Sequence, residues 1–82
     1  MDIVAEITTR IQAAYPDAQV KLNDMTGGGD HWEAMIISET FEGQSRLQRH
    51  RGVYAALGEL MDGPIHALTF RTLTPGQARE EN

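Results

Sequence analysis

Three histidines are the side chains of this 82-residue chain with the clearest capacity for chemistry. His31 follows three consecutive glycines, His50 lies between two arginines, and His66 comes shortly before an apolar run. A neutral imidazole is a common metal ligand and titrates near physiological pH. The chain has no cysteine, which excludes disulfides, thiol catalysis and any metal site made of its own thiolates. A thiolate ligand would therefore have to come from a partner.

Arginines form a second group of interest. Arg46, Arg49 and Arg51 are three of the seven basic residues and fall within six positions. A net charge of −5 argues against phosphate binding by the whole surface, so this cluster would locate one interaction face. It indicates contact with phosphates or with an acidic protein surface. The commoner alternative is a solvated helix face.

Enzyme signatures are missing from the sequence. Ser38, Ser45 and the histidines form no recognisable catalytic triad, and there is neither a P-loop nor a G-x-G-x-x-G motif. A chain of 82 residues also offers little room for an enzyme cleft. We therefore expect a protein that is not an enzyme.

The first half of the chain predicts one helix and two strands. Asp2 can cap a helix that ends at Tyr15-Pro16, since the residue before proline avoids the α region. Its apolar stripe would consist of Ile3, Ile7, Ile11 and Ala14. Alternation around Val20 and Leu22 predicts a short strand, and residues 32–38 predict a second. The glycine loop between them is either a hairpin that needs positive φ or a loop that moves aside for a partner.

The second half predicts a helical hairpin and a third strand. A helix starting at Ser45 would be interrupted at Gly52, and a second would continue to the Asp62-Gly63-Pro64 stop. Residues 65–73 predict the third strand, and residues 76–82 a frayed polar tail. The order is then helix, strand, strand, helix, helix, strand. This order predicts a single α+β domain over residues 1–75, with helices on one face of a three-stranded mixed sheet.

His66 lies at the start of the third predicted strand. Strand alternation puts it on the face of Leu68 and Phe70, opposite Arg71, at the rim of the core. For an arbitrary protein, the commoner role of such a residue is a core-edge histidine that bonds a backbone carbonyl. The residue types alone therefore do not make it a ligand.

Two sequence blocks resemble the BolA family. The first is Phe41-x-Gly43 followed by Arg49-His50-Arg51 and Val53-Tyr54, and the second is Ile65-His66-Ala67-Leu68 ending at Thr74-Pro75. The blocks cover a little under half of the chain, and the flanking segments have the lengths and order of the family. The resemblance implies the α+β fold of that family, which is similar to a class II KH domain.

The resemblance also implies a metal site. In the family, the histidine at the position of His66 ligates a [2Fe–2S] cluster shared with a monothiol glutaredoxin, whose cysteine and a glutathione thiol supply the other ligands. Many members have a histidine or cysteine ligand in the loop before the second strand, and Asp30-His31-Trp32 resembles one such step. The cysteine-bearing members place their ligand nearer Gly28, so His31 is either a second ligand or a solvated loop residue. His50 would instead tie the two helices of the hairpin together.

These observations predict a non-enzymatic adaptor in iron–sulfur trafficking or iron sensing. The alternative is a KH-like nucleic-acid-binding transcriptional regulator that uses the helical hairpin with Arg46, Arg49 and Arg51. A homodimer in the absence of a partner stays open. No apolar run reaches the roughly 20 residues of a membrane span. The cytoplasm is therefore the default location, or an organelle matrix if a transit peptide has been removed.

Overall fold

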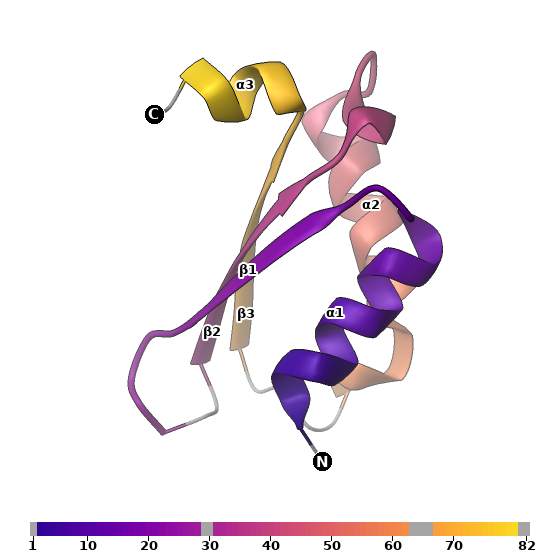
Figure 1. The fold of residues 1–82 in the computed structure, drawn as a ribbon. Coiled ribbons are helices and arrows are strands. Elements are labelled where there is room, and N and C mark those ends of the chain that lie inside the picture. The colour runs from indigo at the N-terminus through magenta and orange to yellow at the C-terminus, as the bar shows by residue number, and fades with distance from the viewer. Residues whose placement is uncertain (1, 29–30, 63–66, 81–82) are drawn as a thin grey trace.

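A computed structural model describes residues 2–28, 31–62 and 67–80 (Figure 1). Its elements in chain order are α1 (Ile3–Ala14), β1 (Gln19–Asp24), β2 (His31–Ile37), the 3₁₀ turn η1 (Glu39–Phe41), α2 (Arg46–Leu57), the 3₁₀ turn η2 (Gly58–Asp62), β3 (Ala67–Leu73) and α3 (Pro75–Glu80). None of the helices in these ranges combines the length and the apolar character needed to cross a membrane.

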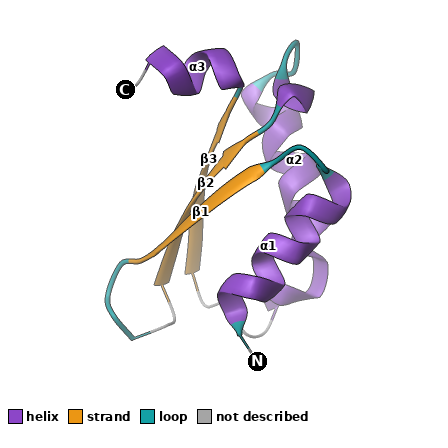
Figure 2. Ribbon diagram, viewed as in Figure 1, coloured by secondary structure: helices purple, strands orange, loops and turns teal. Residues whose placement is uncertain are grey.

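The three strands form one mixed sheet in the order β1-β2-β3. β2 pairs antiparallel with β1 and parallel with β3. Helices α1 and α2 lie together on one face of this sheet, and α3 lies at the end where β3 finishes (Figures 1 and 2). The predicted α+β class, with a three-stranded mixed sheet and helices on one face, is confirmed.

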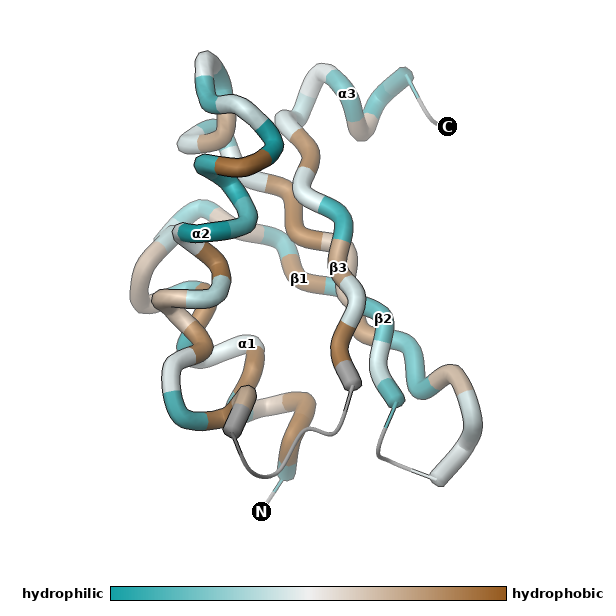
Figure 3. Tube along the Cα trace, turned by 180° about the vertical axis from the view of Figure 1, so that it is seen from behind, coloured by the Kyte–Doolittle hydropathy of each residue, from teal (hydrophilic) through white to brown (hydrophobic). Residues whose placement is uncertain are grey.

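The core fills the layer between the helices and the sheet. Hydrophobic residues recur along α1 and β3, whereas much of the first half of α2 is hydrophilic (Figure 3). The fully or nearly fully buried residues include Ile7, Ile11, Ala34, Ile36, Phe41, Val53 and Leu57. Each large aliphatic or aromatic side chain removed from water in this layer stabilises the fold by roughly 1.5–3 kcal/mol.

Helix α1 begins and ends where the sequence predicts. The Asp2 carboxylate accepts a hydrogen bond from the Ala5 amide at 3.2 Å, and Tyr15 is the C-cap residue. The predicted apolar stripe is wrong at its last position, because Ala14 is exposed. Tyr15 is buried instead, with its ring centroid 5.1 Å from that of Phe41.

The predicted break at Gly52 is wrong. Ser45 caps α2 in a reciprocal capping box with Gln48, and the helix then runs without interruption to Leu57. A Cβ atom added to Gly52 would collide with the Tyr15 hydroxyl, so the glycine allows the end of α1 to approach α2 closely. The helix ends at Gly58, whose φ of +54° suits glycine, and η2 follows.

The C-terminal residues up to Glu80 form helix α3, so the predicted frayed tail is wrong for this segment. Thr74 and Gln77 exchange two hydrogen bonds: the Thr74 amide donates to Gln77 Oε1 at 2.9 Å, and the Gln77 amide donates to Thr74 Oγ1 at 3.1 Å. Pro75 occupies the first helical position, where its missing N–H costs no hydrogen bond. These are standard helix-start signals in the sequence Thr-Pro-Gly-Gln.

Substitution of Gly52 tests the close approach of the two helices. We expect Gly52→Ala to lower the free energy of unfolding by about 1–3 kcal/mol, because the new methyl group overpacks against a buried tyrosine. Chemical denaturation monitored by circular dichroism measures this change.

Two further variants identify the cause. Tyr15→Phe combined with Gly52→Ala should recover most of the loss, since the tyrosine atom that would be struck is the hydroxyl oxygen. Gly76→Ala in α3 is the matched control; its Cβ would have no neighbour closer than 3.9 Å, and it should stabilise by about 0.4–1 kcal/mol. An unaltered or raised stability for Gly52→Ala would contradict the packing account.

Candidate functional site

His31 is the first residue of β2 and its side chain is exposed. In the parallel β2–β3 ladder it pairs with Ala67, the residue that directly follows His66 in the sequence. Adjacent strands lie about 4.8 Å apart, so His31 and Ala67 are neighbours at the end of the sheet where both strands begin. His66 itself lies outside the described residues.

The faces of the sheet constrain this candidate site. Leu68 and Phe70 are buried and Arg71 is exposed, as the predicted alternation of β3 requires. In β2, however, His31 alternates with buried Trp32 and so lies on the face away from the helices. The structure thus places His31 beside Ala67 at one end of the sheet, and the strand parity of the sequence predicts the opposite face for residue 66.

No set of three histidine, aspartate or glutamate side chains gathers to hold a metal ion within residues 2–28, 31–62 and 67–80. His31 could thus contribute one nitrogen ligand to a site whose other ligands lie elsewhere. Such a donor fits a shared cluster, because the chain contains no thiolate and a partner would have to supply sulfur.

The three arginines of α2 have different surroundings. The Arg49 guanidinium donates to the carbonyls of Gln44 and Thr72 at 3.1 and 3.2 Å and to Gln77 Oε1 at 3.0 Å. It also lies over the Phe41 ring, 5.7 Å from the centroid. Arg49 therefore ties α2 to β3 and α3.

His50 contacts β3. Its ring lies 4.6 Å from that of Phe70, and the Tyr54 ring meets Phe70 edge-on at 5.2 Å. The expectation that His50 joins two helices of a hairpin is wrong, because α2 is one continuous helix. The histidine instead helps to pack this helix against the sheet.

A cleft of about 280 Å³ lies between α2 and the end of β3. It is lined by Arg46, His50, Phe70, Arg71, Thr72 and Leu73, and no carboxylate is among these described lining residues. The sequence analysis did not group Arg71 with Arg46, because 25 positions separate them. The packing of α2 against β3 brings them to one cleft.

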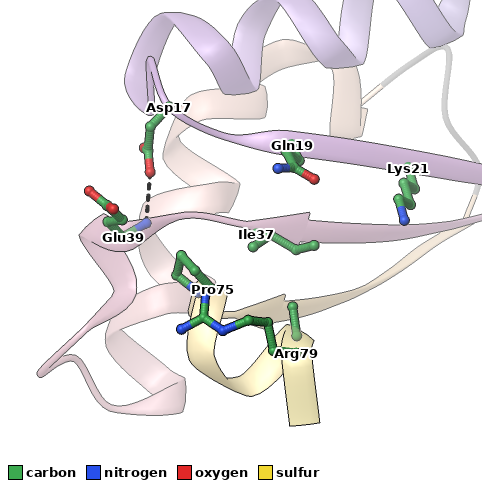
Figure 4. A pocket seen from close by; sticks show the side chains of 8 residues that line it. Asp17, Gln19, Lys21, Ile37, Glu39, Pro75 and Arg79 are labelled. Atoms are coloured by element: carbon green, nitrogen blue, oxygen red, sulfur yellow. Dashed lines mark hydrogen bonds between the residues drawn. The ribbon is translucent and has the colours of Figure 1, made fainter. Parts of the chain in front are cut away.

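A second, wider cleft of about 480 Å³ lies between β1, β2 and α3 (Figure 4). Asp17, Lys21, Glu39 and Arg79 give it mixed charge. The Asp17 carboxylate accepts hydrogen bonds of 2.7 Å from the Ser38 hydroxyl and from the Glu39 amide, and these bonds lower the pKa of Asp17. Asp17 thereby fixes the turn after β2 to the segment before β1.

Comparison with known proteins places this fold in a family. The model of the family described as BolA-like protein matches residues 6–77. The chain belongs to the BolA family. BolA-like protein 1 of Homo sapiens is 38% identical to it over 87 residues, which cover 98% of this chain and 64% of that protein. The chain thus spans just under two thirds of the length of its mammalian relatives.

Two other relatives bear on structure and function. The solution structure of BolA1 from Mus musculus superposes with a TM-score of 0.84 at 35% identity, covering 99% of this chain and 72% of that one. A protein of Escherichia coli (strain K12) named DNA-binding transcriptional regulator BolA is 30% identical over 81 residues, which cover 90% of this chain and 77% of that protein.

The Asp17 contacts predict a pH-dependent contribution to stability. A carboxyl whose folded pKa is depressed stabilises above its unfolded value of about 3.9, and this contribution is lost as pH falls through the lower folded pKa. We expect Asp17→Asn to be less stable than the wild type at neutral pH, with a difference that shrinks below about pH 4. Urea unfolding midpoints at neutral and acidic pH measure it. Glu33→Gln, which removes a charge from the open face of the sheet, should not reproduce this convergence; a constant difference for Asp17→Asn would contradict the assignment.

Proposed function

We propose that this BolA-family chain is a non-enzymatic adaptor that binds a monothiol glutaredoxin and helps to ligate a bridging [2Fe–2S] cluster. The observation that carries the proposal is the register of β2 and β3. It places exposed His31 beside Ala67, next in the chain to His66, the position that ligates in the family. The proposed location of this adaptor is the cytoplasm.

The number of ligands explains the need for a partner. A [2Fe–2S] cluster takes four protein or thiol ligands, and imidazole can replace thiolate on one of its irons. This chain would offer His66 and, as the second group, His31. The cysteine of the glutaredoxin and the thiol of glutathione would provide the sulfur that the chain lacks.

Histidine ligation suits a carrier or a sensor. A proton competes with the metal for a neutral imidazole, so such a cluster is released more readily as pH falls. The cluster is then cargo that can be passed on, in iron–sulfur trafficking or in iron sensing.

The adaptor proposal predicts a spectroscopic change. When the protein is mixed with a cluster-loaded monothiol glutaredoxin, we expect the visible absorption and circular dichroism of the cluster to change, because histidine replaces a ligand. His66→Ala should abolish the change, and His31→Ala should weaken it if His31 is the second ligand.

Controls separate ligation from folding. Gln19→Ala, at the other end of the sheet, should behave as the wild type. His66→Cys should restore a bound cluster with a shifted spectrum, because thiolate also ligates iron. An identical spectral change for wild type and His66→Ala would rule out ligation by His66.

A nucleic-acid-binding regulator is the second candidate. It is supported by helix α2, which contains three arginines and no acidic residue, and by the name of the Escherichia coli relative. Phosphate contacts from exposed Arg46 and Arg51 would supply affinity, since the Arg49 guanidinium already makes three hydrogen bonds within the protein.

Salt dependence tests this candidate. We expect binding to a labelled DNA duplex to weaken by at least about tenfold between roughly 50 and 200 mM salt. Arg46→Gln and Arg51→Gln should each reduce the salt slope by about one. Arg79→Gln, an exposed arginine in α3, is the matched control and should leave both quantities unchanged. Affinity that does not respond to salt would count against a phosphate-binding surface.

A further inference from the structure

The cleft between α2 and β3 lies in a basic part of the described chain. Helix α2 and strand β3 together contain four of the seven basic residues and no aspartate or glutamate. In a chain of net charge −5, this separation creates a local positive potential. Two of the four arginines, Arg46 and Arg71, line the cleft directly.

An aromatic side chain, Tyr54, contacts the cleft residue Phe70. Arg46, His50 and Tyr54 recur every four residues and so form one stripe of α2, about 12 Å long. Tyr54 remains 48% exposed although its ring edge packs on Phe70. The stripe therefore starts with a cation and ends with an aromatic ring that is held in place and accessible.

We propose that this cleft binds a nucleotide unit, with its phosphate between Arg46 and Arg71 and its base stacked on Tyr54. This inference deepens the second candidate function and rests on it. Guanidinium groups match phosphate oxygens with paired hydrogen bonds. The phosphate and the base of one nucleotide lie roughly 10 Å apart or less. Arg46 and Tyr54 lie about 12 Å apart along the helix axis, a difference that the long arginine side chain can close. The His50 imidazole, between the two ends, can donate an N–H to the phosphate or sugar.

The competing occupant is an acidic peptide. Its carboxylates would pair with Arg46 and Arg71, but they would make no specific contact with the exposed Tyr54 ring, which packs on Phe70. Stacking on an aromatic side chain is the contact that every nucleobase can make, whatever its sequence. The position of Tyr54 therefore favours the nucleotide.

Fluorescence anisotropy with a labelled single-stranded oligothymidylate of ten nucleotides tests the proposal. We expect Arg46→Gln and Arg71→Gln each to weaken binding by about fivefold or more, and Tyr54→Leu to weaken it by a similar factor through lost stacking. Leucine keeps the apolar contact with Phe70, and thermal unfolding verifies that each variant is folded. Arg79→Gln is the matched control and should stay within about twofold of the wild type.

Three results would overturn the inference. Full affinity in Arg71→Gln, with a loss in Arg46→Gln, would move binding from the cleft to the general surface of α2. Full affinity in Tyr54→Leu would remove the base contact. If an oligoglutamate of the same charge competes as effectively as unlabelled oligothymidylate, the cleft is a binding site for acidic peptides.

Thymidine 5′-monophosphate distinguishes the source of the nucleotide. Amide shifts at residues 46–54 and 70–73 on adding it would identify a site for free nucleotides. Binding of the oligonucleotide with shifts in the same segments, but none from the monophosphate, would identify a site for a strand. Absence of shifts with both ligands overturns the inference. If the protein binds the single strand but no duplex, the duplex-binding regulator is contradicted and the nucleotide site in the cleft is not. The glutaredoxin experiment tests neither of these two proposals.

Discussion

The parallel pairing of β2 with β3 is the constraint from which most other features follow. Two adjacent parallel strands cannot be joined by a tight turn, so the chain must cross over between them. Here the crossover contains α2 and both 3₁₀ turns, and it places α2 beside α1 on one face of the sheet. The same pairing brings His31 next to Ala67 at one end, and farther along β3 Arg71 lines one cleft with Arg46 and His50 of α2.

Short-range signals in the sequence were sufficient for much of the fold. The Asp2 cap and the strand alternation depend on neighbours in the chain, and the three-stranded sheet follows from the alternation. The requirement for glycine at position 52 inside a continuous α2 was not predictable in this way, because it comes from a tyrosine hydroxyl 37 positions earlier in the sequence. Helix α3 was predictable in principle, since Thr74, Pro75 and Gln77 form a recognisable helix start.

The candidate sites show the same division between local and long-range information. His31 and the α2 arginines could be selected from the sequence by residue type and by resemblance. The different surroundings of Arg49 and Arg46 could not, because they depend on carbonyl and amide oxygens of residues 72 and 77. The register also puts the two proposed sites at different positions along β3. Arg71 follows Ala67 by four residues in β3, so the two positions lie about 13 Å apart along the strand.

The bond from Arg49 to the Thr72 carbonyl has a consequence for self-association. In the sheet order β1-β2-β3, β3 is an outer strand, and exposed strand edges template pairing with other chains. The Leu73 carbonyl points toward β2, where it accepts a hydrogen bond from the Ser38 amide. Successive carbonyls of a strand point to opposite sides, so the Thr72 carbonyl points away from β2, toward the open edge of the sheet. The Arg49 guanidinium already donates to the Thr72 carbonyl, so a strand of another chain cannot pair with β3 at this position. A dimer that extends the sheet would therefore more readily form at β1, the other outer strand. Arg49 opposes edge-to-edge aggregation through β3.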